Sequence, residues 1–141
     1  MSGCAGYEPI FSTKKLSFYI ETIENVNDSK ITRKISKNLN NNKVKIENKK
    51  NYTLKIVSDK KNNITSRDSR GVASTYEMAI NVEIEVFYNN MITPIATFMI
   101  NKKSNYKNQI NKFSLSQYKN TIEENIIREI AQEITIKLHS L

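Results

Sequence analysis

The longest regular pattern of apolar and polar residues lies in the middle of the chain. In TYEMAINVEIEVFYN, residues 75–89, every second residue is apolar, and most of those between are acidic or polar. A period of two is that of a β-strand, and one apolar face opposite a polar face is typical of a sheet covered on one side only. The apolar positions are Tyr76, Met78, Ile80, Val82, Ile84, Val86 and Tyr88.

Three further segments alternate in the same way. They are LSFYIET at residues 16–22, NYTLKIVS at residues 51–58 and ITPIATFMINKK at residues 92–103. Each predicts a strand, and Pro94 favours an edge position or a strand start, because proline has no N–H for the ladder of a central strand. The polar segment at residues 58–74 is interpreted as a connection between two strands, and a long hairpin turning near Gly71 is one form of it.

A short segment changes to helical spacing. In NDSKITRKISKNLNNN, residues 27–42, the apolar residues Ile31, Ile35 and Leu39 are four apart and fall on one face. Asp28 or Ser29 stands before them as an N-cap candidate. The sequence therefore predicts a short amphipathic helix with a basic outer face.

The end of the chain predicts a second, longer helix. In QYKNTIEENIIREIAQEITIKL, residues 117–138, an apolar residue recurs at every fourth position. Glu123 and Glu124 lie early in this predicted helix, where acidic side chains suit the helix dipole. The apolar stripe consists of Tyr118, Ile122, Ile126, Ile130, Ile134 and Leu138.

The predicted order is β-α-β-β-β-α. Strands with one apolar face and helices with one apolar stripe bury these faces against each other. We therefore expect an α+β two-layer sandwich, a four-stranded mixed sheet with two helices on one face. The helix between the first two strands allows these to run parallel, whereas the later strands, joined by hairpins, should be antiparallel.

Composition restricts the function classes. A chain of 141 residues with one Cys and one His forms a single domain, cannot form an internal disulfide and lacks the ligands for a zinc site of its own. The sequence contains no apolar run long enough to span a bilayer and no catalytic or phosphate-loop motif. Glu83 and Glu85 fall on the polar face of their strand and are expected to be solvated. We expect no catalytic residues, no metal and no enzymatic activity.

The charge indicates an anionic partner. Lys and Arg number 22 against 14 Asp and Glu, a net charge of +8. Lys60, Lys61, Arg67 and Arg70 would cluster at one hairpin tip, and such a cluster can bind phosphate or carboxylate groups. A small basic cytosolic module that binds nucleic acid is an alternative, for which Tyr19 and Phe87 would be the candidate exposed stacking residues.

The first fifteen residues, MSGCAGYEPIFSTKK, have no periodicity and contain the only cysteine, Cys4. Two small residues before a cysteine, followed by a segment with Gly6 and Pro9, match the end of a bacterial lipobox, although the sequence shows no basic and apolar signal segment before it. We interpret residues 1–15 as a lipobox remnant with a flexible tether, and residues 16–141 as one domain.

Four segments of the chain resemble the LptE family of lipopolysaccharide (LPS) assembly lipoproteins. Cys4-Ala-Gly-Tyr-Glu-Pro-Ile is similar to the family's mature N-terminus, and SFYIETIENVNDSKITRKISKNL to its first strand and helix. SRDSRGVASTYEMAINVEIEV resembles its polar hairpin and long strand, and SNYKNQINKFSLSQYKNTIEENIIREIAQEITIKL its closing helix. The order of these segments covers nearly the whole chain and agrees with the predicted order of elements.

The resemblance implies a non-enzymatic subunit that plugs the LptD β-barrel, supports its assembly and binds LPS for insertion into the outer leaflet. It implies a covalent lipid on Cys4 that anchors the chain to the outer membrane, and no other cofactor. Arg67 and Arg70 best match the family's basic hairpin residues, and Lys112, before the last helix, matches less well. With Lys60 and Lys61 they form the predicted LPS-binding set. An unrelated periplasmic lipoprotein of similar architecture is a further alternative.

Overall fold

A computed structural model describes residues 18–39 and 50–141. The predicted order of elements, β-α-β-β-β-α, is confirmed. The elements are β1 (Phe18–Asn25), α1 (Lys30–Asn38), β2 (Lys50–Arg67), β3 (Ala73–Tyr88), β4 (Ala96–Lys107) and α2 (Lys112–His139).

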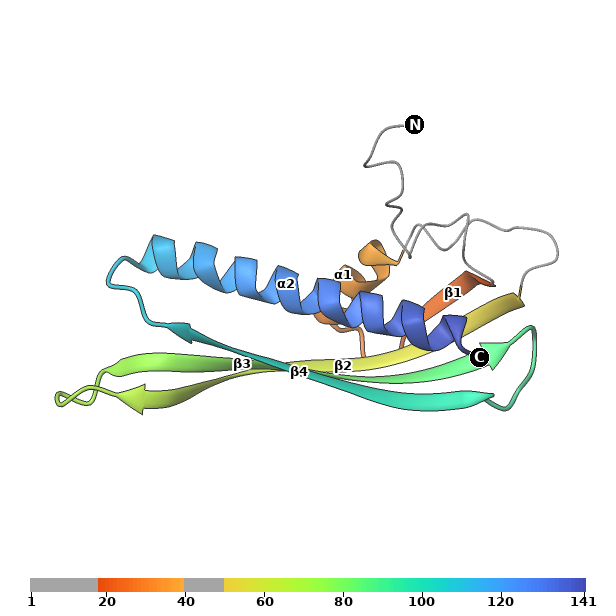
Figure 1. Cartoon of the computed structure of the whole chain (residues 1–141), viewed down its shortest axis with the longest axis horizontal. Coiled ribbons are helices and arrows are strands. Elements are labelled where there is room, and N and C mark those ends of the chain that lie inside the picture. Colours follow the sequence, from red (N-terminus) through yellow and green to blue (C-terminus); the bar gives the residue numbers. More distant parts are fainter. Residues whose placement is uncertain (1–17, 40–49) are drawn as a thin grey trace, which may run out of the picture.

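The strands form one mixed sheet in the order β1-β2-β3-β4. As expected, β1 pairs with β2 in parallel, and the other two pairs are antiparallel. Both helices lie on the same face of the sheet, so the molecule has the predicted two layers, and α2 runs along much of the length of the sheet (Figure 1). Pro94 stands just before β4, which is an edge strand, in agreement with the prediction.

The core fills the space between the helices and the sheet. Tyr52, Leu54 and Ile56 from β2 are buried, as the alternation predicts. Paired residues of neighbouring strands point to the same side of a sheet. The predicted apolar residues of β3 therefore lie on the same face as Tyr52, Leu54 and Ile56, the face covered by the helices. The helices contribute Ile31, Ile35, Leu39, Ile126, Ile127, Ile130, Ala131, Ile134 and Leu138.

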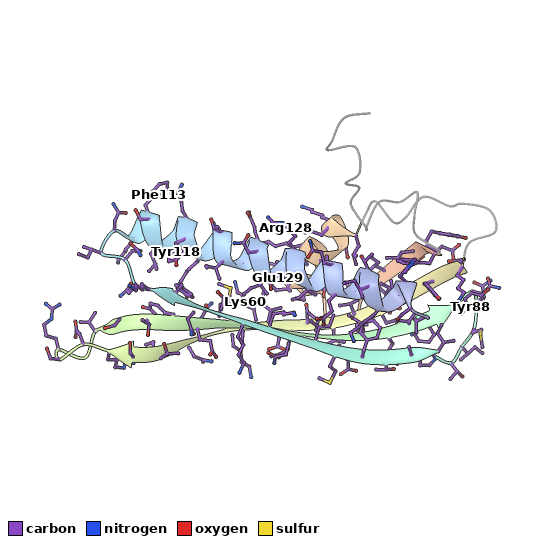
Figure 2. The ribbon with its side chains drawn as sticks, viewed as in Figure 1. Lys60, Tyr88, Phe113, Tyr118, Arg128 and Glu129 are labelled. Atoms are coloured by element: carbon purple, nitrogen blue, oxygen red, sulfur yellow. The ribbon has the colours of Figure 1, made fainter. Side chains whose placement is uncertain are left out.

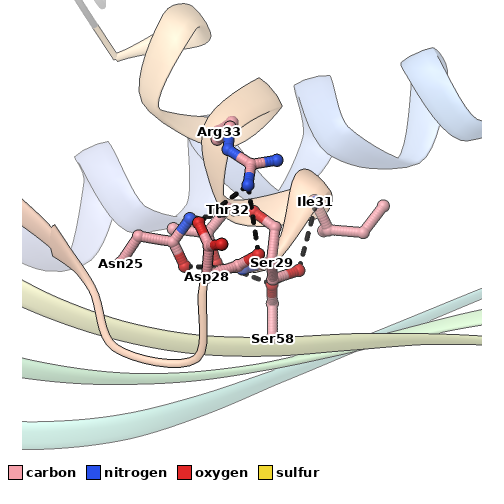
Figure 3. Close-up of polar contacts among 7 residues, drawn as sticks. All are labelled: Asn25, Asp28, Ser29, Ile31, Thr32, Arg33 and Ser58. Atoms are coloured by element: carbon pink, nitrogen blue, oxygen red, sulfur yellow. Dashed lines mark hydrogen bonds and ion pairs between the residues drawn. The ribbon is translucent and has the colours of Figure 1, made fainter.

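The start of α1 is fixed by side-chain hydrogen bonds (Figure 3). Ser29 is the N-cap, one of the two predicted candidates, and its Oγ accepts from the N–H of Ile31 at 3.1 Å. Asn25 binds both the N–H and the carbonyl of Ser29, each at 2.9 Å. Behind the cap, Ser58 on β2 contacts the hydroxyls of Ser29 and of the buried Thr32. This polar cluster joins α1 to the sheet.

Several boundaries differ from the predictions. β1 begins at Phe18, and β4 runs from Ala96 to Lys107, so Ile92 and Ile95 precede this strand instead of lying in it. Two further differences are larger. β2 does not end near Ser58 but continues to Arg67, and its added half pairs with β3, so the connection takes the form of the long hairpin that the sequence allowed. From Asp59 onward all of its residues are exposed, so pairing with β3 and polar contacts hold this half of the strand, and it needs no apolar alternation. The second difference is that α2 begins at Lys112, because the side chain of Asn111 accepts from the N–H groups of Phe113 and Ser114.

Candidate functional site

The structure separates the five predicted basic residues into three places. Arg67 ends β2 at the hairpin tip, and Arg70 lies in the turn that follows. Lys60 and Lys61 pair with Ile80 and Ala79 of β3, so the expectation that they lie at the tip is wrong. Because β2 continues to Arg67, they precede the tip by six or seven residues, about 20 Å at roughly 3.3 Å per residue.

Lys112 opens α2, rather than preceding the last helix as expected. The segment that leads into this helix is fastened to the start of β3. The N–H of Asn108 donates to the Ser74 carbonyl at 2.9 Å, and its Nδ2 donates to the Ala73 carbonyl at 2.8 Å. These two bonds bring the first turn of α2 to the same end of the molecule as the hairpin tip.

The turn at the tip is built around Asp68. Its Oδ1 accepts from the N–H of Arg70 at 2.8 Å and of Val72 at 3.0 Å, and its carbonyl accepts from Gly71. Gly71 has a φ of +81°, in the left-handed region that glycine enters without strain. The hydrogen bond from the backbone N–H of Val72 lowers the pKa of Asp68, and the bonds from Arg70 lower it further. Partial desolvation raises this pKa by a smaller amount. The turn therefore has a defined shape and an ionised carboxylate at its centre.

Both arginines of this turn are exposed. The guanidinium of Arg67 donates to the Gly71 carbonyl at 2.9 Å, and that of Arg70 lies 3.3 Å from Asp68 Oδ2. The side chain of Arg70 is 81% exposed, and an ion pair this exposed contributes little to stability. Each guanidinium retains further donors for an anion.

Exposed apolar side chains lie at the same end of the molecule as these cations, and none of them was predicted as a site residue. Val72 is 50% exposed, Phe113 is 69% exposed, and Ile110 is exposed completely. Figure 2 shows Phe113 and Tyr118 on the first turns of α2, at the end of the molecule where the long hairpin turns. We call Arg67, Arg70, Val72, Ile110, Lys112 and Phe113 the tip surface.

A hollow of about 370 Å³ joins the two parts of the tip surface. Arg70 and Val72 line it from the hairpin, and Ile110 lines it from the segment before α2, together with Asp68, Ala73, Ser74, Asn108 and Gln109. An anion held by Arg70 there would have apolar side chains beside it. This arrangement suits a ligand that carries both an anionic group and an apolar part.

Three tyrosines support α2 above this part of the sheet. The rings of Tyr76 and Tyr106 stack with centroids 5.2 Å apart, and Tyr118 meets Tyr106 edge-on at 6.0 Å. The buried Tyr106 donates its hydroxyl to Asn62 at 2.9 Å, and its burial raises its pKa. These contacts hold the first half of α2 in place although its apolar residues are only partly buried.

Lys60 has a structural contact instead of a place at the tip. Its ammonium lies 2.7 Å from Oε2 of Glu123, and Lys34 from α1 binds Oε1 of the same carboxylate. Glu123 is only 5% exposed and lies in the middle of α2, so the interpretation of this residue as a helix-start acid is wrong. Burial by itself raises the pKa of Glu123, but the hydrogen bonds and charges of the two lysines outweigh it and lower the pKa. This carboxylate joins α1, α2 and β2.

The comparison with protein families decides the family of the chain. The family model described as "LptE: Lipopolysaccharide-assembly" matches residues 16–138. The chain belongs to the LptE family. The resemblance seen in the sequence is thereby confirmed, and assembly of LPS is the role of the family.

Solved structures share the fold of this LptE-family chain. Rare lipoprotein B from Shewanella oneidensis is 19% identical with a TM-score of 0.65, and the match covers 86% of this chain and 94% of that one. A minor lipoprotein from Acinetobacter baumannii is 12% identical with a TM-score of 0.64, covering 89% and 93%. Lipoprotein B from Nitrosomonas europaea is 12% identical with a TM-score of 0.63, covering 96% and 91%. A search of curated protein sequences finds no significant match.

The remaining sequence predictions fare differently. Cys4, the predicted lipidation site, lies outside the described residues. Tyr19 and Phe87, the candidate stacking residues for nucleic acid, are only 6% and 7% exposed, so the structure removes the aromatic support for that alternative. Within residues 18–39 and 50–141, no helix is long and apolar enough to cross a membrane, and no group of side chains has the composition of a metal site.

Proposed function

We propose that this LptE-family chain is a non-enzymatic, lipid-anchored subunit of the outer membrane that plugs the lumen of the LptD barrel, supports its assembly and binds LPS. The tip surface is the LPS-binding site in this proposal. Arg67 and Arg70 bind phosphate groups of the lipid A and inner-core region, and Lys112 at the start of α2 is the weaker candidate. Lys60 and Lys61 have a lesser part, because Lys60 is paired with Glu123 and Lys61 lies on the open face of the sheet.

The observation that carries the LPS proposal is the exposure of cations and apolar groups on one surface. Exposed arginines alone would suit many anions, and exposed apolar residues alone would suit many partners. The combination of Arg70 with Val72 and Ile110 around one hollow fits an anionic amphiphile. LPS has this chemistry, since its phosphates lie next to its acyl chains.

The direction of the chain fits an anchor at one end and ligand contact at the other. Phe18 pairs with Lys50 at the start of β2, whereas the tip lies beyond Arg67 at its end. An 18-residue strand spans roughly 55 Å at about 3.3 Å per residue. A lipid on Cys4 would therefore hold the β1 end near the membrane, and the tip surface would extend away from the anchor into the barrel.

The open face of the sheet suits contact with the polar interior of a barrel. Its central register positions are Asp59, Asn81 and Asn101 on one row and Lys61, Ala79 and Lys103 on the next. In this proposal that face lies against the barrel wall. The charge and hydrogen-bonding groups along it would then serve the LptD contact rather than LPS.

The LPS proposal is tested by binding of the purified chain to LPS, measured by displacement of a fluorescent LPS probe. The variant Arg67→Gln with Arg70→Gln removes two cations from the tip surface. We expect its affinity to fall by about tenfold or more, since about 1.4 kcal/mol corresponds to a factor of ten and charge-assisted bonds to phosphate are among the stronger ones. Lys112→Gln should have a smaller effect.

The matched control removes the same charge elsewhere. Lys30→Gln with Lys103→Gln takes two exposed lysines from α1 and from the open face. If this control weakens LPS binding as much as the arginine pair does, the net charge rather than the tip binds LPS. If the chain prefers DNA to LPS at equal ionic strength, the nucleic-acid alternative replaces the proposal. Co-purification of LptD, and loss of membrane fractionation in Cys4→Ala, test the other two parts.

A further inference from the structure

The turn between β3 and β4, at the opposite end of the sheet from the tip surface, exposes a second group of apolar side chains. Ile92 is 96% exposed, Met91 is 53% exposed and Ile95 is 43% exposed. Tyr88, where β3 ends, is 39% exposed, and Figure 2 shows it at this end of the molecule. We call Tyr88, Met91, Ile92 and Ile95 the apolar turn. Turns of water-exposed hairpins favour Asn, Gly, Asp, Ser and Pro at such positions.

Backbone hydrogen bonds hold the apolar turn in a defined shape. The N–H of Asn89, whose φ is +56°, donates to the Asn51 carbonyl at 2.9 Å. The N–H of Met91 donates to Tyr88 at 3.2 Å, and that of Ile95 donates to Val86 at 2.8 Å. Both sides of the turn are therefore fastened to the sheet. Ile92 projects outward from a supported turn instead of folding back onto the core.

The described chain begins at this same end. Phe18, the first residue of β1, pairs with Lys50, and Asn51 next to it bonds to Asn89 of the turn. Phe18 and the apolar turn are thus separated by about two strand spacings, roughly 10 Å. Thirteen residues lie between Cys4 and Phe18, and they reach at most about 45 Å when fully extended. A membrane that holds a lipid on Cys4 is within reach of this end of the molecule.

We infer that the apolar turn is a second membrane contact, which inserts Met91 and Ile92 into the interfacial layer of a phospholipid bilayer. The inference rests on the proposed lipid anchor at Cys4. Burial of a few apolar side chains gives only weak membrane affinity by itself. In a chain already tethered to the bilayer by a lipid, the same burial adds to the affinity of the anchor and keeps the turn in contact with the membrane.

The surroundings of the turn agree with this partner. A tyrosine such as Tyr88 suits the membrane interface, where its ring is in the apolar layer and its hydroxyl is in the polar layer. Lys55 lies over the ring of Phe87 at 5.0 Å, and both line a hollow of about 330 Å³ with Met91 and Ile92. The side chain of Lys55 is 42% exposed, and its ammonium, 4.0 Å from the Glu24 carboxylate, is placed to meet lipid phosphates. Glu24 and Glu21 lie nearby and would limit attraction to strongly anionic bilayers.

The sequence offers a direct test, because it contains one Cys and no Trp. The full chain is coupled through Cys4 to a maleimide phospholipid in phosphatidylcholine vesicles, whose lipids have no net charge to attract the cations of the tip surface. This coupling imposes the anchor and does not depend on natural lipidation. Two variants report on the two ends of the molecule: Ile92→Trp in the apolar turn and, as a matched control, Phe113→Trp in the tip surface.

We expect the fluorescence of Ile92→Trp to shift to the blue on tethering and to be quenched by lipids that carry a bromine or nitroxide near the headgroup. Phe113→Trp should be unaffected. In a second measurement, the thiol carries a single-chain lipid, which binds only marginally, and Ile92→Ser should lower vesicle retention by roughly tenfold relative to the unsubstituted chain.

An emission spectrum of Ile92→Trp that does not change on tethering, or equal quenching at both positions, would overturn the inference. Retention unaffected by Ile92→Ser would do the same and would point to a protein partner for the turn. The proposed LPS function is judged separately, by the arginine variants at the tip. A negative result for membrane contact by the apolar turn therefore leaves the LPS proposal standing, and the reverse also holds.

Discussion

Glu123 gives the sharpest test of how the two layers are held together. It is a buried carboxylate on α2 that accepts charge-assisted hydrogen bonds from Lys34 on α1 and Lys60 on β2. The substitution Glu123→Gln keeps the size of the side chain and removes its charge. The amide oxygen can still accept from one lysine, but the second ammonium then faces an amide nitrogen. We expect the free energy of unfolding to fall.

The exposure of the partners sets the magnitude. Breaking a fully buried ion pair costs about 3–5 kcal/mol, because a charge is left without water or a partner. Here the side chains of Lys34 and Lys60 are 47% and 34% exposed, so water can hydrate both once Glu123 is neutral. We therefore expect a loss of about 2 kcal/mol. In a chain of 141 residues this corresponds to a decrease in Tm of roughly 8 °C.

The assay is urea denaturation at pH 7 followed by circular dichroism, with Glu124→Gln as the matched control. Glu124 is the adjacent residue, of the same type, but it is exposed. Its substitution should change the free energy of unfolding by less than about 0.5 kcal/mol. The pair separates the effect of the buried contacts from the general effect of removing one acidic residue from α2.

The pH dependence supplies the second half of the test. The folded state lowers the pKa of Glu123 below its ordinary value of 4.5. The stability that its carboxylate contributes is therefore complete above that pH and is lost as the pH falls through the lowered folded-state pKa. The difference between the unsubstituted chain and Glu123→Gln should be constant from pH 5 to 7 and should shrink in more acidic solution. A difference that persists unchanged in acid, or that Glu124→Gln reproduces, would refute the assignment.

Two smaller effects follow from local geometry. Gly71→Ala places a side chain at a φ of +81°, where no atom lies within 4 Å of the added Cβ, so the cost is backbone strain of about 1 kcal/mol. Hydrogen exchange of the tip amides should therefore accelerate about fivefold, and unchanged exchange would contradict this prediction. Thr32→Val removes the 2.7 Å bond to Ser58, which keeps Ser29 as a partner. We expect a loss of about 1 kcal/mol in urea denaturation, and a larger loss for Ser58→Ala, which removes both bonds.

The alternation of residues predicted the fold well because burial on one face decides most of it. The apolar positions from Met78 to Val86 in β3 are buried, and so is the predicted stripe of α2 from Ile126 to Leu138. Prediction failed where burial does not act. The second half of β2 is exposed on both faces, and the first turns of α2 extend beyond the core, so neither segment needs an apolar period.

The same reason explains what was missed at the functional surfaces. Lys60 looked like one member of a basic run, and only the register of β2 against β3 places it under α2, within reach of Glu123. The partner of a buried charge comes from another part of the chain, and spacing within one segment does not reveal it. The position of Arg67 and Arg70 at the hairpin tip was predicted correctly, because a turn brings together residues that are near in sequence.

The apolar half of the tip surface shows the limit most clearly. Val72 comes from the hairpin turn, while Ile110 and Phe113 come from the approach to α2, and in the sequence each is an isolated apolar residue in a polar segment. The two bonds that Asn108 makes to β3 bring these segments together. Only then do Val72 and Ile110 lie around one hollow with Arg70. The net charge of the chain indicates an anionic ligand but not which one. The assembled surface favours an anionic lipid over a nucleic acid, because an acyl chain can cover the exposed side chain of Ile110 and a phosphate backbone cannot.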